Sequence, residues 1–207
     1  MSLADGRFDL LETMAFDPHE GIRLLELHLA RMKVSADALG FAFDRHDVRN
    51  ELQAATFRLR DRSRVRLLVS RGGALAIEVR AHRTWPQAIV PVAVVPRQAP
   101  ADDPRLRHKT TDRALYRDAL RRGGTYEVLL TDAEGFLTEG CFSTLFVERG
   151  DKLVTPPLTR GLLPGVLRQS LIDMGEAAEA DLKVHDLERG FFIGNAARGM
   201  VAATLAR

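Results

Sequence analysis

The residue best suited to covalent chemistry is Lys109, because the chain has few lysines; the others are Lys33, Lys152 and Lys183. A lysine amine can bond covalently to a carbonyl carbon when its pKa falls toward neutrality, and nearby cations lower that pKa. The cationic neighbours in the sequence are Arg107, His108 and Arg113. A solvated lysine in a basic loop is the alternative, so Lys109 needs supporting motifs before it defines a site.

Three other segments combine small residues with groups that bind anions or cofactors. Gly161–Arg168 is a glycine-flanked loop entering a helix, and the amides at a helix start attract anions; a plain loop-to-helix start is the alternative. Glu139 lies between a strand end and the small residues that follow, where it is either functional or a solvated turn carboxylate. Asn195 and Arg198 follow an apolar strand, where they bind a ligand or belong to an ordinary turn.

The elements expected before the lysine form a compact α+β unit. Hydrophobic patterning predicts a strand over Phe8–Phe16 and a turn at residues 17–21. It also predicts two helices, one from Leu25 to Gly40 and one over His46–Phe57. Three apolar strands are then expected, at Val65–Ser70, Leu75–Val79 and Ile89–Val95.

Lys109 falls at the expected boundary between two domains. Residues 96–108 are proline-rich and lack periodicity, so the domains are predicted at residues 1–97 and 109–207, with a linker at 98–108. The second domain should contain a helix over Asp112–Arg122, a strand meander over Glu127–Pro157 and a helix opened by Pro164. A strand, a short helix and a strand at Phe191–Gly194 should close it. Clefts between domains commonly bind ligands.

Composition excludes several classes of protein. The formal net charge of +2 comes from arginines interleaved with acids, without the basic stripe of a nucleic-acid-binding protein. No apolar run is long enough to cross a membrane, and no signal peptide is evident. The single cysteine, Cys141, is interpreted as a small buried side chain and favours a cytoplasmic location. No metal site is expected.

In order and spacing, these motifs resemble the class IV aminotransferase family, the fold-type IV pyridoxal phosphate enzymes. The resemblance spans Phe8–Ala203 and includes the upstream segment His28–Met32. It implies a two-domain α+β fold like that of D-amino acid aminotransferase, with the cofactor in the interdomain cleft, and a homodimer. The segments Phe8–Thr13, His108–Tyr116 and Arg160–Val166 are most similar to the aminodeoxychorismate lyase branch.

The resemblance also implies residue roles. Lys109 would bind the cofactor covalently and move the proton, and Glu139 would face the ring nitrogen. The cofactor phosphate would be bound by Arg31, the amides of Val166 and Leu167, and Asn195. The expected substrate contacts are Thr13, Arg107 and Arg198.

The implied reaction releases pyruvate and 4-aminobenzoate from 4-amino-4-deoxychorismate, for folate synthesis. The alternatives are a class IV transaminase acting on another amino acid and a non-catalytic relative. Ala114 stands where the branched-chain transaminases carry a tyrosine, which speaks against that branch. Residues 195–197 read Asn-Ala-Ala where lyase-like regions commonly have Asn-Ser, so one polar contact is absent.

Overall fold

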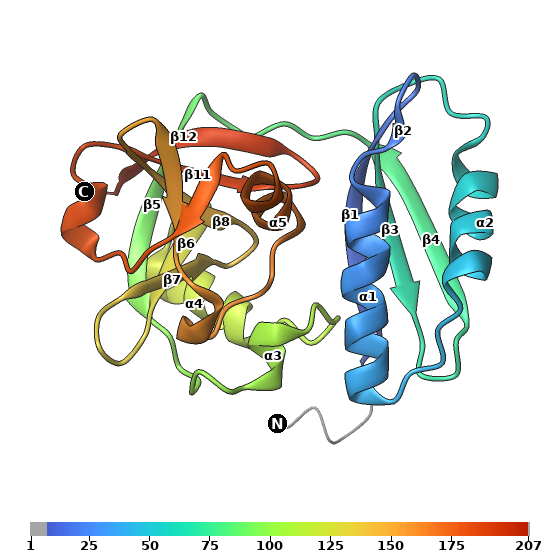
Figure 1. Cartoon of the computed structure of the whole chain (residues 1–207), viewed down its shortest axis with the longest axis horizontal. Helices are drawn as coiled ribbons and strands as arrows, with labels where there is room; N and C mark the ends of the chain where they lie inside the picture. Colours follow the sequence, from blue (N-terminus) through green and yellow to red (C-terminus); the bar gives the residue numbers. More distant parts are fainter. Residues whose placement is uncertain (1–7, 207) are drawn as a thin grey trace. The chain divides into compact units, whose positions relative to one another are not determined.

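The computed structural model describes residues 8–206 and divides them into two units. The first unit runs to Thr84 and takes in His108–Asp112 as well. The second contains Trp85–Arg107 and the chain from Arg113 onward. Each unit has a sheet of its own (Figure 1).

The first unit packs two helices on an antiparallel sheet with the strand order β2-β1-β3-β4. Its elements, in chain order, are β1 (Leu10–Asp17), β2 (Gly21–Ile22), α1 (Leu25–Leu39), α2 (Arg45–Thr56), β3 (Ser63–Val69) and β4 (Leu75–Ala81). Alternation along β1 buries Leu10, Met14 and Phe16 in one cluster. Leu29 and Met32 of α1 complete that core from the helix side.

One end of each helix follows an ordinary capping rule. Gly40 ends α1 in the left-handed conformation, with φ of 69°. Asp44 caps α2, because its carboxylate accepts hydrogen bonds from the amides of His46 and Asp47. The predicted strand, turn and helices of this unit are therefore confirmed to within a few residues.

The second unit is built on an eight-stranded mixed sheet with the order β10-β9-β8-β11-β12-β5-β6-β7. Its strands are β5 (Ile89–Pro96), β6 (Glu127–Thr131), β7 (Leu137–Gly140), β8 (Thr144–Arg149), β9 (Lys152–Thr155), β10 (Ala177–Glu179), β11 (Phe191–Asn195) and β12 (Gly199–Leu205). Its helices are α3 (Pro104–Arg107), α4 (Ala114–Gly123), η2 (Leu158–Arg160), α5 (Val166–Asp173) and η3 (Val184–Leu187).

Two assignments differ from the domain division expected at residues 97 and 109. The strand β5 pairs in parallel with β6 and β12, so it belongs to the second unit. Lys109 belongs to the first unit, since the segment around it is bonded to β1. The expected linker also contains the short helix α3.

Two further differences concern the end of the chain. The helix expected to open at Pro164 begins at Val166. The strand β12 was not expected, although it lies inside the sheet between β11 and β5.

Candidate functional site

The main chain around Lys109 is held against the edge of β1. The amide of Leu11 donates to the carbonyl of Lys109 at 3.0 Å, and Thr110 forms a bridge with Leu10. The amide of Thr111 donates to the carbonyl of Asp9 at 2.9 Å. The Lys109 side chain is partly buried. These bonds distinguish Lys109 from a solvated lysine in a loose basic loop.

A buried ion cluster lies in the same unit. The Arg31 guanidinium donates from Nε to Oε1 of Glu12 at 2.8 Å and from Nη2 to Oε2 at 2.6 Å. The His28 Nδ1 lies 2.7 Å from the same Oε2. The exposed fractions of the side chains are 2% for Glu12, 1% for His28 and 10% for Arg31. The carboxylate is therefore enclosed by its two partners.

The charges of this cluster follow from burial and pairing. Burial would raise the pKa of Glu12, but Arg31 and His28 outweigh it and hold the pKa well below its usual range. Burial lowers the pKa of His28, and the charges of Arg31 and Lys109 add to the lowering, although Glu12 opposes it. Because His28 is then neutral and faces an ionised acceptor, its Nδ1 carries the hydrogen. Its Nε2 is buried and has no hydrogen-bond partner among the described residues.

In the second unit, Glu139 is held in a fixed direction. It lies on β7 with 5% of its surface exposed. Its Oε1 accepts a hydrogen bond from the Tyr116 hydroxyl at 2.7 Å, and its Oε2 accepts one from the amide of Leu163 at 3.1 Å. A solvated turn carboxylate would have neither the burial nor these partners.

The loop bearing Leu163 is in turn fixed by Arg97 and Gly161. Arg97 Nη1 donates to the carbonyls of Arg160, at 2.8 Å, and Gly161. Gly161 has φ of 72°, and a Cβ there would lie 2.4 Å from the carbonyl oxygen of Ala101. Only glycine fits that position without a backbone shift.

The predicted phosphate-binding amides belong to the first turn of α5. Val166 is the first residue of the helix and Leu167 the second, and no side chain caps the start. Gly165 precedes them, where a Cβ would lie 2.6 Å from the Thr144 Oγ1. A helix start without a side-chain cap suits an anion, and the phosphate contact of Val166 and Leu167 stays a prediction.

Asn195 and Arg198 make definite contacts with the protein itself. The Asn195 Nδ2 donates to the carbonyl of Phe142 at 3.0 Å, and its Oδ1 accepts from the amides of Ala197 and Arg198. The Arg198 guanidinium carbon lies 5.3 Å from the Trp85 ring centre and 5.5 Å from that of Phe142. Asn195 thus fixes the turn after β11, and Arg198 is held among aromatic rings.

The remaining predicted residues differ in their surroundings. Thr13 lies on β1 and is partly buried, on the opposite face from Glu12. Arg107 is exposed at the end of α3. Cys141 is a free thiol, 1% exposed, with its pKa raised by burial to about 12, as expected of a small buried side chain.

Two buried acids, Glu12 and Glu127, were not predicted from the sequence. Glu12 follows the alternation of the apolar residues on one face of β1, and that pattern was the available signal. Glu127, on β6, accepts from the amides of Val128, Cys141 and Phe142 and from the Ser143 hydroxyl. Burial raises the pKa of Glu127 to about 7.

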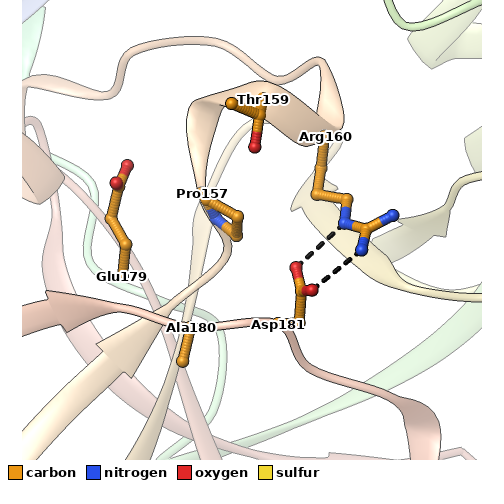
Figure 2. Close-up of a pocket in the computed structure, with 6 residues that line it drawn as sticks. All are labelled: Pro157, Thr159, Arg160, Glu179, Ala180 and Asp181. Carbon is orange, nitrogen blue, oxygen red and sulfur yellow. Dashed lines mark hydrogen bonds and ion pairs between the residues drawn. The ribbon is translucent and has the colours of Figure 1, made fainter.

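A pocket of about 410 Å³ lies elsewhere in the second unit (Figure 2). Its walls come from η2, the end of β10 and the segment after β10, and they include none of the predicted site residues. Arg160 spans it to Asp181, with Nε–Oδ1 and Nη2–Oδ2 distances of 2.9 and 2.8 Å. The other charged group there, Glu179, pairs with Arg168, which lies outside the pocket walls.

Comparison with known proteins places the chain in a family. Residues 9–205 match the model for amino-transferase class IV. A protein of Schizosaccharomyces pombe named "Putative aminodeoxychorismate lyase" is 31% identical over 184 residues, which is 84% of this chain and 77% of the relative. The chain therefore belongs to the class IV aminotransferase family.

Solved structures agree with that assignment. A Mesorhizobium loti structure described as "Putative amino-acid aminotransferase" has a TM-score of 0.88 and 34% identity, covering 96% of this chain and all of the other. The PLP-bound form of "a hypothetical aminotransferase" from Mycobacterium tuberculosis has a TM-score of 0.78 and 23% identity. That comparison covers 99% of this chain and 84% of the other. The expected fold-type IV architecture is confirmed.

Proposed function

We propose that this chain binds pyridoxal 5′-phosphate and eliminates pyruvate from 4-amino-4-deoxychorismate, giving 4-aminobenzoate. The observation that supports the cofactor is the fixed carboxylate of Glu139, buried and oriented by Tyr116 and the amide of Leu163. The S. pombe relative, similar over most of both chains, supports the lyase reaction.

The side chains fit the chemical groups of this cofactor. Its phosphate needs cationic and amide donors, for which we propose Arg31 and the amides in the first turn of α5. In the first unit, the charges of Arg31 and Lys109 both act on the buried His28, so two cationic side chains lie near the Glu12 cluster. The protonated ring nitrogen needs an anion, and Glu139 provides a carboxylate held by two donors.

The cofactor, when bound, supplies an electron sink for a negative charge developing on the substrate carbon. Lys109 would hold the cofactor and then take the proton from the substrate carbon that bears nitrogen, at Nζ. Glu139 would keep the ring nitrogen protonated. Arg107, Arg198 and Thr13 are the proposed contacts to the substrate. The two products together contain the atoms of the substrate, so no other reactant is needed.

A second candidate is transamination of an amino acid. It is favoured by the likeness to the M. loti structure, whose name is that of an aminotransferase. Both candidates use the same lysine and the same cofactor. In transamination the amino group of the substrate is transferred to the cofactor, whereas in the elimination it stays on the product.

One experiment separates the two. Purified protein loaded with pyridoxal 5′-phosphate is incubated with 4-amino-4-deoxychorismate, and 4-aminobenzoate and pyruvate are measured. In parallel, a panel of amino acids and keto acids tests for amino transfer. Stoichiometric formation of both products without a keto acid supports the lyase, whereas turnover only with an amino acid and keto acid pair supports the transaminase. The absence of turnover with any of these compounds would indicate a non-catalytic relative.

The rest of the proposal concerns the setting in which the enzyme works. Among residues 8–206, no helix is both long and apolar enough to cross a membrane. We further propose a cytoplasmic homodimer acting in folate synthesis. Sedimentation of the purified protein tests the dimer.

A further inference from the structure

We propose that Glu12 is a positioning residue for the cofactor phosphate, acting through Arg31. This inference rests on the proposed function, because it takes Arg31 to bind that phosphate. It assigns a role to a residue that does not itself touch the cofactor.

A carboxylate at this position is costly unless it has a specific use. Its neighbours on the same face of β1 are Leu10, Met14 and Phe16, all in the core of the first unit. An ionised group among such residues loses its hydration, which only close partners offset. Arg31 and His28 provide those partners, and both come from α1. Through this cluster, Glu12 on β1 fixes the orientation of the Arg31 side chain on α1.

The geometry of the pair fixes the direction of the guanidinium. Two parallel bonds join Nε and Nη2 of Arg31 to the two oxygens of Glu12. A guanidinium is planar, so holding that edge also sets the direction of the donors on Nη1. His28 holds the carboxylate from a second side, at 2.7 Å. Arg31 is thus oriented before any ligand arrives, which lowers the entropy lost on binding.

Two observations point to a ligand beside this cluster. The His28 Nε2 is an acceptor in a side chain that is 1% exposed, and it has no partner among the described residues. Lys109 is near enough for its charge to lower the pKa of His28. A buried acceptor beside two cationic side chains suits a ligand that carries both negative charge and a hydrogen-bond donor, as a phosphate monoester does when singly protonated.

The test compares two ligands that differ only in the phosphate. Affinities of the cofactor-free protein for pyridoxal 5′-phosphate and for pyridoxal are measured by absorbance titration, and their ratio reports the phosphate contact. Glu12→Gln should lower that ratio about tenfold or more, the scale of one charge-assisted hydrogen bond. The affinity for pyridoxal should change little. A general loss of structure would instead lower both affinities together and leave the ratio unchanged.

Glu26→Gln is the matched control. Glu26 is also on α1 and also pairs with two arginines, Arg45 and Arg49, but it is exposed. Its variant should keep the wild-type ratio. In an Arg31→Ala background, Glu12→Gln should have no further effect on the ratio, because Glu12 acts through that arginine.

Each result decides the question. A ratio that is unchanged in Glu12→Gln, or that falls equally in Glu26→Gln, overturns the proposal, as does a wild-type protein that binds both ligands equally. If Glu12→Gln does not fold, Glu12→Asp replaces it: the shorter side chain cannot reach both partners, so the ratio must fall, and an unchanged ratio overturns the proposal. No substrate is used, so a failed lyase assay leaves this result standing.

Discussion

The hydroxyl of Tyr116 on α4 donates a hydrogen bond of 2.7 Å to Oε1 of Glu139 on β7, and both residues are buried. Burial, and next the charge of Glu139, raise the pKa of Tyr116 well above its ordinary value, so the phenol remains a donor at every pH of interest. The guanidinium carbon of Arg113 lies 3.8 Å from the centre of the Tyr116 ring. The carboxylate thus depends on a phenol whose own position is fixed.

Tyr116→Phe should separate orientation from charge at Glu139. The variant keeps the ring in the core but removes the phenol donor to the carboxylate. We expect about 1 kcal/mol less stability and roughly tenfold lower turnover, because Glu139 would be less well held. Urea unfolding and steady-state kinetics measure the two quantities. Unchanged kinetics would show that the amide of Leu163 is enough to orient Glu139.

Glu139→Gln tests the charge itself. Glutamine keeps the size of the side chain and accepts a hydrogen bond, but it cannot stabilise a protonated ring nitrogen. The variant should still bind pyridoxal 5′-phosphate, with altered absorbance, while turnover falls by orders of magnitude, at about tenfold per 1.36 kcal/mol. Retained turnover would limit Glu139 to a structural role.

Lys109 can be identified chemically. The purified protein should be yellow, and borohydride should fix the cofactor irreversibly to Lys109. Among the described residues, this lysine is the one whose charge lowers the pKa of His28 in the buried cluster. Peptide mapping by mass spectrometry locates the label. A label on Lys33, Lys152 or Lys183 would contradict the assignment.

The local elements could be predicted because local patterns determine them. Alternation and turn residues specify β1, while helical spacing and Gly40 specify α1. The sheet to which a strand belongs is a different matter, as β5 shows. Its apolar pattern predicted a strand, but its partners β6 and β12 are distant in sequence, and no local feature names them.

The candidate site was predictable in part for the same reason. Motif order singled out Lys109 and Glu139 as candidates, whereas the contacts that hold candidate side chains in place are long-range. Tyr116 precedes Glu139 by 23 residues, and Glu12 precedes Arg31 by 19. The strand β12 (Gly199–Leu205) was missed because its sequence shows no alternation of apolar and polar residues. Pairing with β11 and β5 stabilises it instead.

Glu127 makes the stability of the protein depend on pH. Burial raises its pKa from 4.5 to about 7, although Ser143 and three backbone amides favour the ionised form. At pH values between these two pKa values, Glu127 is protonated in the folded state but ionised in the unfolded state. The free energy of unfolding therefore falls as pH rises through this range. The decrease amounts to at most about 3 kcal/mol and levels off above the folded pKa. His28 acts in the opposite sense, because its folded pKa is lowered.

The contribution of Glu127 is therefore isolated by comparing wild type with Glu127→Gln, which stays neutral at every pH. Urea unfolding at pH 5, 6, 7 and 8 gives the free energy of unfolding of each protein. The variant should gain stability relative to wild type as pH rises, because only the wild type must ionise a buried carboxyl group. His28 is present in both proteins, so its effect cancels in the difference. The exposed variant Glu26→Gln should keep the wild-type profile in this range. Parallel curves for wild type and Glu127→Gln would mean that the four hydrogen bonds to Glu127 fully offset its burial and keep its pKa near the ordinary value.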